Sequence, residues 1–310
     1  MRSRVFPALA LTTALLTVGL IVVGAVVRVT DSGLGCGDHW PLCNGTIFPP
    51  LDNLTAWIEW SHRLLAMLIG VFGIVMLITA VRNYRHERRG VLVATVVAAL
   101  MYAAQAGLGV AVVKQELNPT LVAVHLGTAM LLLGGLLVAA LLAVYTPGKR
   151  HPRDNFTLLA YTTAAFSLLI IFTGAIVRGS GATMACVTWP LCNGDVFPFA
   201  QGPLQTVHML HRFAVVALGV TLALLVVSAW KNRSGTSRLL TVLALAAYLS
   251  QAAIGAGVVY SAAASVWAAA HVLFAAITWA LLVVLSVIES LNTAEGFEGE
   301  WHPQSEPLLN

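Results

Sequence analysis

The sequence predicts an all-α membrane protein with eight transmembrane helices, built as two tandem four-helix bundles that a parallel internal repeat relates. Its composition, with 58% hydrophobic and 10% charged residues and a mean hydropathy of +0.85, gives more apolar surface than a soluble core can bury. Long apolar stretches recur along nearly the whole chain, and motifs of the first half return in the same order in the second. The lipid bilayer is therefore the expected solvent.

Each predicted helix is a stretch of about 20 mostly apolar residues, the length that crosses the hydrocarbon layer. The stretches are continuously apolar and not alternating, which favours helices over a barrel. The first follows Arg2 and Arg4 as a signal peptide would, but it lacks a small-residue cleavage site before Asp31, so we expect it to be retained. The eight stretches are 9–29, 57–80, 91–113, 120–145, 157–177, 206–229, 239–260 and 265–288.

Basic residues lie mostly in three connecting loops, 81–90, 146–156 and 230–238. Because cytoplasmic loops are enriched in Lys and Arg, we expect a multi-pass protein of the plasma membrane with these loops and both termini inside. This distribution accounts for the net charge of +4, so nucleic acid is not an expected partner. The chain from Glu289 onward is expected to form a solvated cytoplasmic tail.

An internal repeat divides the chain into related halves. The offset between matching segments narrows only from 150 to 146 residues, so we predict an N-terminal half (1–148), a C-terminal half (149–290) and a tail (291–310). Four helices per half is an even number, so the copies are parallel, unlike the inverted repeats of many transporters. The matching segments are 24–28 with 174–178, 40–45 with 189–194, 62–63 with 211–212, and His125 with His271.

Four histidines lie at matched places in the predicted helices. His62 and His211 fall about five residues into the second helix of each half, and His125 and His271 about five residues into the fourth. Such residues are costly inside a membrane and usually mark function, although a single one is often only a hydrogen-bonded packing residue. At about 1.5 Å rise per residue, each pair lies at matching depth near the outer face. A flat macrocycle held between two imidazoles needs this arrangement.

We therefore predict two bis-histidine haem sites, one in each half. A zinc or copper site would need a third or fourth ligand, which the sequence does not offer nearby. Four arginines could contact the haem propionates, which need cationic partners. For Arg28 and Arg178, which end the first helix of each half, snorkelling to the membrane surface is the alternative; Arg63 and Arg212 directly follow the histidines.

Glu59 distinguishes the first half from the second. It lies one turn before His62, on the same helix face, whereas His208 occupies the matching position near His211. A carboxylate there can exchange a proton with a substrate or stabilise positive charge that develops on it. Glu59 is therefore the candidate catalytic residue, and the alternative is a carboxylate that only benefits from the helix dipole. We assign no role to His39, which lies in a loop.

All four cysteines lie in two predicted outer loops, on the oxidising side of the membrane. Four cysteines allow three pairings, and pairing within each loop, Cys36 with Cys43 and Cys186 with Cys192, is the simplest. Such disulfides either staple the loops or exchange with a partner oxidoreductase.

The segment 57–63 (WIEWSHR), the duplicated WPLCNG loops and the four histidines together resemble the bacterial haem A synthase family, in its cysteine-containing subgroup, over about residues 9–288. The resemblance implies that a methyl group of haem O is oxidised by successive hydroxylations to a formyl group, giving haem A for cytochrome oxidase. It implies a haem b cofactor on His211 and His271, and substrate haem O on His62 and His125 beside Glu59. Haem O synthase, a membrane electron acceptor and a second copy of the chain are candidate partners.

Two other functions fit the histidine pairs. A cytochrome b-type electron carrier would hold permanent haems in both halves, and Glu59 would then be dispensable. A haem transporter or chaperone would move haem without changing it, so no formyl haem would appear.

Overall fold

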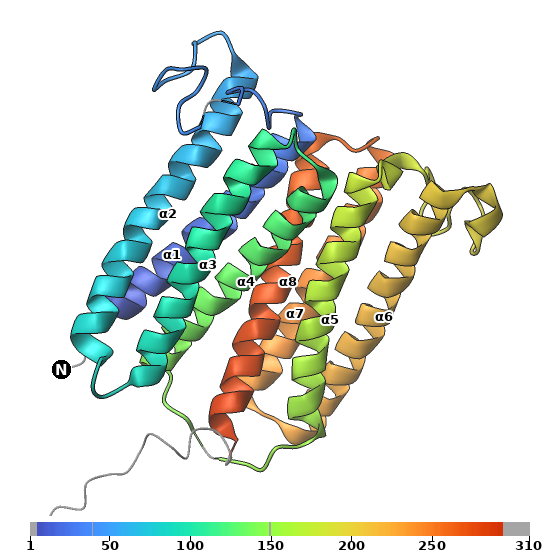
Figure 1. Ribbon diagram of the computed structural model, residues 1–310. Helices are drawn as coiled ribbons and strands as arrows, with labels where there is room; N and C mark the ends of the chain where they lie inside the picture. Colours follow the sequence, from blue (N-terminus) through green and yellow to red (C-terminus); the bar gives the residue numbers. More distant parts are fainter. Residues whose placement is uncertain (1–4, 39, 149, 294–310) are drawn as a thin grey trace, which may run out of the picture.

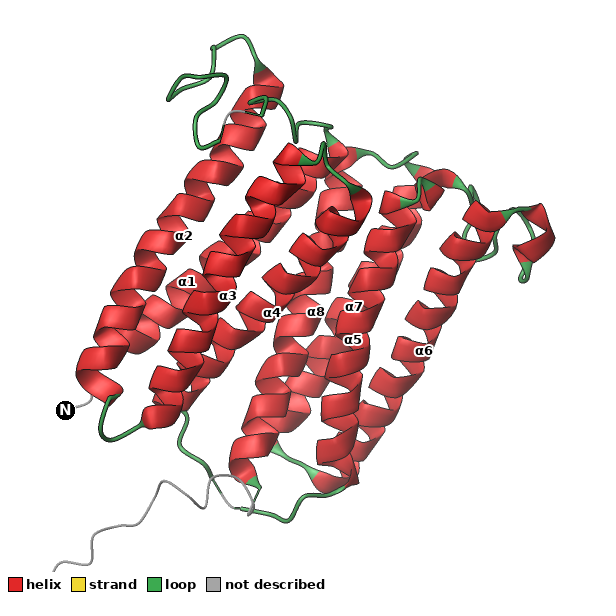
Figure 2. Ribbon diagram, viewed as in Figure 1, coloured by secondary structure: helices red, strands yellow, loops and turns green. Residues whose placement is uncertain are grey.

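Eight long helices form the described part of the chain, as the sequence predicts. The computed structural model describes residues 5–38, 40–148 and 150–293, so His39 and the predicted tail beyond residue 293 lie outside the described residues. The helices make up most of the described chain (Figure 2). They are α1 (Val5–Val29), α2 (Leu54–Tyr84), α3 (Arg89–Lys114), α4 (Pro119–Val144), α5 (Asn155–Gly179), α6 (Pro203–Asn232), α7 (Gly235–Tyr260) and α8 (Ser265–Asn292), with two short 3-10 helices, η1 (Ala182–Met184) and η2 (Pro198–Gln201).

Polar residues set the starts of several helices. The Asn53 side chain accepts a hydrogen bond from the backbone of Ala56 at the start of α2, and Asn118 caps α4 directly before Pro119. Such caps satisfy backbone N–H groups that have no partner within the helix. Because the Asn53 cap precedes the apolar stretch, α2 begins three residues before the predicted range. Helix α6 also begins three residues early, at Pro203, where the cap residue Gly202 offers no side chain.

The eight helices stand side by side in one bundle (Figure 1). Within the first half, α1 contacts α2 and α4, and α3 contacts α2 and α4; in the second half, α5 contacts α6 and α8, and α7 contacts α6 and α8. The halves meet where α1 and α4 contact α8 and where α4 contacts α5. At this junction the Trp279 indole N–H donates to the carbonyl of Met130 (2.8 Å). The same arrangement within each half agrees with the repeat in the sequence.

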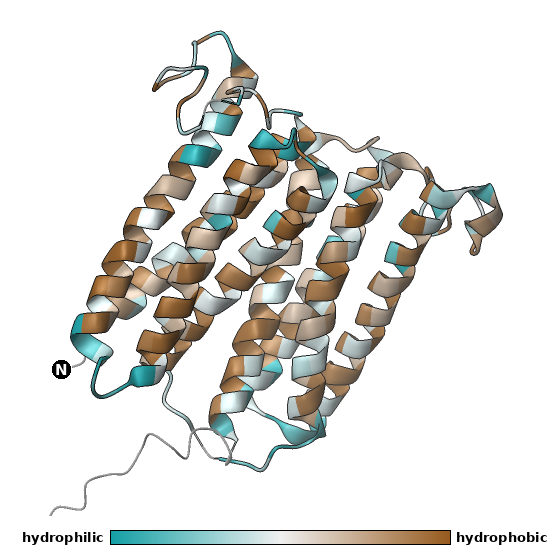
Figure 3. Cartoon of the chain, viewed as in Figure 1, coloured by the Kyte–Doolittle hydropathy of each residue, from teal (hydrophilic) through white to brown (hydrophobic). Residues whose placement is uncertain are grey.

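Apolar side chains cover the outside of the bundle (Figure 3). Leu15, Leu100, Val216 and many other large hydrophobic residues are exposed along the helices, which would be unstable in water over so wide a surface. All eight helices are long and apolar enough to cross a membrane. The chain is a multi-pass membrane protein.

The two ends of the bundle differ. One end carries the loop between α1 and α2 and the loop between α5 and α6, each with a disulfide, and we call it the disulfide end (Figure 1). The opposite end carries the loops rich in arginine and lysine, and we call it the basic end.

Glu289 corrects one prediction, because it does not begin a solvated tail. It lies in the last turn of α8 with no exposed surface, and Arg233 pairs with it at 2.8 Å. The Ser237 hydroxyl donates to it as well (2.7 Å), and Arg233 also binds Asp154 (2.9 Å), the residue that caps α5. The burial is tolerated because the carboxylate is both paired and hydrogen-bonded. This cluster joins α5, α6, α7 and α8 at the basic end.

Candidate functional site

The four helix histidines occupy equivalent places in the two halves. His62 and His211 are each the ninth residue of their helices, α2 and α6, and His125 and His271 are each the seventh residue of α4 and α8. All four helices begin at the disulfide end (Figure 1). With about 1.5 Å of rise per residue, the members of each pair therefore lie at nearly the same depth, somewhat deeper than the sequence suggested.

A glycine on the preceding helix makes room for each imidazole. A methyl group placed on Gly24 of α1 would lie 3.1 Å from Cε1 of His62, and one on Gly174 of α5 would lie 3.3 Å from Cε1 of His211. The histidines of α4 and α8 lie in the same way against Gly109 and Gly255, at 3.5 and 3.1 Å. A methyl group would crowd the rings at Gly24, Gly174 and Gly255, whereas at Gly109 it would make an ordinary van der Waals contact. The three tight glycines therefore leave space that their histidines use.

In the second half, both imidazoles are held through Nδ1. The Nδ1 atom of His211 lies 2.7 Å from the hydroxyl oxygen of Thr173 on α5. Nδ1 of His271 lies 3.1 Å from the carbonyl oxygen of Gln251 on α7. In each ring Nε2 is then the remaining nitrogen that can bind a metal.

In the first half, the corresponding Nδ1 atoms of His62 and His125 are buried and have no hydrogen-bond partner. The carbonyl of Leu20 on α1 is near enough to His62 to interact electrostatically, but it completes no hydrogen bond with Nδ1. The side chain of Gln105 on α3, at the position that matches Gln251, donates to the backbone carbonyl of His125 (2.8 Å) and not to its ring.

A cavity of about 610 Å³ lies beside the second-half histidines and extends toward the first half. His211 and His271 line it, and most of its remaining wall is apolar, with residues from α1 and α4 closing the side next to the first half. Pockets of this size and character commonly hold small organic cofactors.

Arg28 and Arg178 both line this cavity, although they belong to different halves. Arg178 donates to the backbone carbonyl of Arg28 (3.3 Å), and the exposed carboxylate of Asp31 lies 3.9 and 3.7 Å from the two guanidinium groups. The sequence suggested one such arginine for each haem. The structure instead brings both to the edge of the second-half cavity.

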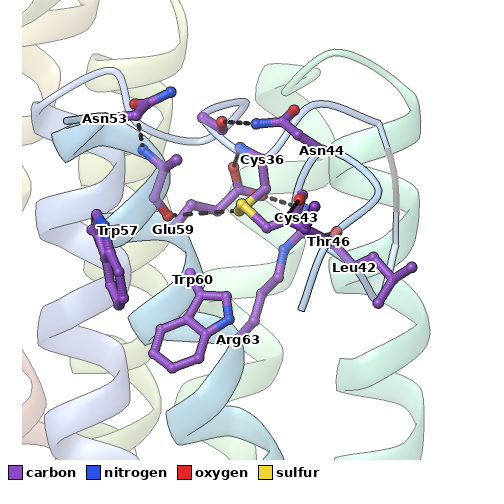
Figure 4. Close-up of a disulfide and its surroundings, with 12 residues drawn as sticks. Cys36, Leu42, Cys43, Asn44, Thr46, Asn53, Trp57, Glu59, Trp60 and Arg63 are labelled. Carbon is purple, nitrogen blue, oxygen red and sulfur yellow. Dashed lines mark hydrogen bonds and ion pairs between the residues drawn. A yellow bond between two sulfur atoms is a disulfide. The ribbon is translucent and has the colours of Figure 1, made fainter. Parts of the chain in front are cut away.

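Glu59 lies under the disulfide loop of the first half (Figure 4). Only 3% of its surface is exposed. Its carboxylate accepts a hydrogen bond from the backbone N–H of Cys36 (2.8 Å) and another from the guanidinium group of Arg63, one turn further along α2. The carboxyl group is thus fixed by two hydrogen bonds and shielded from solvent, next to the histidine that follows it by three residues.

Arg63 and Arg212 anchor the disulfide loops. Arg63 donates to the carbonyl of Leu42 (2.9 Å); Arg212, which is buried, donates to the carbonyls of Thr188 (2.8 Å) and Cys186 (3.3 Å), among others. These bonds use guanidinium N–H groups that the sequence suggested as donors to haem propionates. The sequence did not predict this anchoring role, because every residue has a backbone carbonyl and the sequence cannot show which carbonyls an arginine will contact.

The disulfides pair within each loop, Cys36 with Cys43 and Cys186 with Cys192, as predicted. His208, which stands where the first half has Glu59, is buried and donates from Nδ1 to the carbonyl of Ala182 (2.9 Å). The second half thus has a neutral hydrogen-bonding ring in place of the carboxylate.

The second-half site fits a haem. Two rings on facing helices, each with Nδ1 held and Nε2 left to bind a metal, border a largely apolar cavity with two arginines at its edge. Within the described part of the chain, no three His, Cys, Asp or Glu side chains gather as a metal-binding group. The donor chemistry therefore suits a macrocycle that brings its own four ligands and takes two imidazoles.

Comparison with known proteins gives the family. The model of the cytochrome oxidase assembly protein family COX15-CtaA matches residues 7–283. The chain belongs to this family. A protein named heme A synthase from Halalkalibacterium halodurans is 31% identical over 290 residues, 90% of this chain and 96% of the relative. The heme A synthase of Alkalihalophilus pseudofirmus is 30% identical over 284 residues, 88% of this chain and 94% of the relative. That of Shouchella clausii is 34% identical over 253 residues, 77% of this chain and 82% of the relative.

Two residues of this COX15-CtaA protein that contact the site were missed in the sequence, Thr173 and Gln251. The signal for Thr173 was present, since it directly precedes the repeated segment 174–178 and differs from Val23, which precedes segment 24–28. Gln251 acts through its backbone carbonyl, so no sequence pattern could have identified it.

Proposed function

We propose that this protein is a haem A synthase, which oxidises a methyl group of haem O to a formyl group. The name of its relatives supports the reaction. The observation that carries the proposal is the duplicated histidine pair with a buried carboxylate, Glu59, in one half only. One half can then do chemistry while the other holds a resident cofactor.

The second half (149–290) would hold haem b through His211 and His271, and Arg28 and Arg178, which line the same cavity, would be the cationic partners of its propionates. The geometry that supports this is the cavity and the held Nδ1 atoms of both rings. When bound, this haem supplies one-electron chemistry. The surrounding residues orient the rings and exclude water from the apolar walls.

The first half (1–148) binds haem O through His62 and His125, with its reactive methyl group near Glu59. Two successive two-electron oxidations would each add a hydroxyl group derived from water to the methyl carbon and release two protons, and the resulting gem-diol would lose water to give the aldehyde. Glu59 acts on the proton that leaves or on positive charge that develops at this carbon. Arg63 and the Cys36 N–H keep the carboxylate in place. The four electrons released would pass to a membrane acceptor, and a haem held by His211 and His271 would supply the one-electron chemistry that this needs.

The orientation follows from charge and redox environment. The basic end faces the cytoplasm of the cell, together with both termini, because loops rich in Lys and Arg remain on that side of the plasma membrane. The disulfide end faces the oxidising exterior. Both haem sites then lie nearer the outer surface.

Analysis of extracted haems tests the proposal. The protein is produced in cells that make haem O and lack their own formyl-haem enzyme, and the haems are identified by absorption and mass. We expect haem A with the wild type, none with His62→Ala, and undiminished haem A with His86→Ala, a control on the exposed loop between α2 and α3. Haem A missing from the wild-type cells, with both haem sites filled, would favour an electron carrier.

A further inference from the structure

The two halves differ in what holds the first histidine of each pair. Segment 173–178 of α5 and segment 23–28 of α1 correspond, but the first residue is Thr173 in one and Val23 in the other. Both precede the glycine that lies against the imidazole, Gly174 and Gly24. Only the threonine can form a hydrogen bond through its side chain.

The hydrogen bonds of Thr173 fix the tautomer of His211. A hydroxyl group has one proton to donate, and Thr173 donates it to the carbonyl of Ile170 (2.8 Å). With the hydroxyl proton on Ile170, the contact of 2.7 Å with Nδ1 of His211 has the ring N–H as donor and the hydroxyl oxygen as acceptor. Nε2 consequently carries the lone pair that a metal needs.

His271 is fixed in the same way by a different group. Its Nδ1 lies 3.1 Å from the carbonyl oxygen of Gln251, and a carbonyl only accepts. Both rings of the second half are therefore set as Nε2 ligands before any metal binds.

The first half lacks this arrangement. The methyl groups of Val23 cannot accept a proton, and Nδ1 of His62 is buried without a partner. Nδ1 of His125 has none either, and the Gln105 side chain binds the His125 backbone and the Thr128 hydroxyl instead of the ring. The Leu20 carbonyl lies near the His62 ring but completes no hydrogen bond with Nδ1. Neither Nδ1 is therefore held as in the second half, and neither ring gains the basicity that a bound N–H acceptor provides.

We propose that Thr173 is a positioning residue that makes His211 a tight haem ligand, and that Val23, its counterpart, leaves His62 a weak ligand so that the first-half haem can exchange. The proposal rests on the proposed function, in which the first half must release its product while the second keeps its cofactor. Hydrogen-bond partners of a metal-binding histidine typically change metal affinity about 10- to 100-fold. A difference of this size is enough to distinguish a haem that stays bound from one that exchanges.

Haem transfer to apomyoglobin measures the effect directly. We expect Thr173→Val to release second-half haem about 10- to 100-fold faster and to raise the midpoint potential of that haem, because a less basic imidazole stabilises ferric iron less. Thr173→Ser keeps the hydroxyl group, so its release rate and midpoint potential should equal those of the wild type. Thr162→Val is the matched control, since the exposed Thr162 hydroxyl on α5 bonds only to carbonyls of its own helix, and it leaves both values unchanged.

The converse variant tests the first half. Val23→Thr supplies the missing acceptor, so we expect haem bound to the first half to transfer more slowly. Unchanged release and potential in Thr173→Val, with haem bound in the second half of the wild type, would refute the inference and leave the proposed function intact. A wild-type second half that binds no haem would overturn the proposed function itself.

Discussion

Replacing Glu59 by glutamine separates its charge from its shape. The carboxylate accepts one hydrogen bond from the Cys36 backbone (2.8 Å) and another from Arg63, and the side chain is almost fully buried. A glutamine amide has one oxygen to accept with, and its NH₂ group would face a second donor. At least one of the two bonds is therefore lost in Glu59→Gln.

The structure sets the size of the effects. A hydrogen bond to a charged group contributes about 1.5 to 3 kcal/mol, so Glu59→Gln should loosen the Cys36–Cys43 loop without unfolding α2. Glu59→Ala removes the carboxylate from Arg63 and should cost about 3 to 5 kcal/mol, as for other broken buried pairs. If Glu59 also takes part in proton transfer, either change should lower haem A formation about 10²- to 10⁴-fold.

The ratio of haem A to haem O, measured by mass analysis of extracted pigments at equal protein level, is the assay. Haem b in the second half is the internal control, because none of its expected contacts involves Glu59. Glu59→Asp keeps the charge and should retain more activity than Glu59→Gln. A glutamine variant that makes haem A at the wild-type rate would refute the reasoning, since loss of charge would then not matter.

Three further predictions concern the packing of the halves. Glu289→Ala should lower the free energy of unfolding by about 3 to 5 kcal/mol, because Arg233 loses its fully buried partner at 2.8 Å. Thermal denaturation in detergent measures this loss, and an unchanged melting midpoint would contradict the prediction. Burial tends to raise the pKa of Asp154, but hydrogen bonds from Arg233 and from the start of α5 outweigh it and hold that pKa well below its usual range. The contribution of Asp154 to the free energy of unfolding should then be complete above its unfolded pKa of about 3.9, and it should disappear as the pH falls through the lower pKa of the folded state. Asp154→Asn lacks this contribution at every pH, so it should lose less stability in acid than the wild type. Gly127→Ala would place a methyl group onto the Phe172 ring between the halves and should cost about 1 to 3 kcal/mol; adding Phe172→Ala should recover part of it in the same melting assay.

The sequence was sufficient for features that depend on composition along the chain. Eight spans follow from apolar length against bilayer thickness, and the structure confirms all eight. The loop disulfides are confirmed as well, because six or seven residues of separation bring the cysteines together whatever the rest of the fold does. Glu289 was assigned wrongly because the sequence that follows it is polar and rich in glutamate, while its burial depends on Arg233, a residue 56 positions away.

The sequence by itself determined the repeat, the helices and the depth of each histidine in the bundle, since these depend on the pattern along the chain and on the rise per residue of a helix. Tertiary structure alone decided which groups face one another: Arg28 with Arg178 beside one cavity, Arg63 and Arg212 on loop carbonyls, and Thr173 on His211. The physical reason is that such partners are chosen by how helices pack sideways and by which way each side chain turns, and neither property repeats along the sequence.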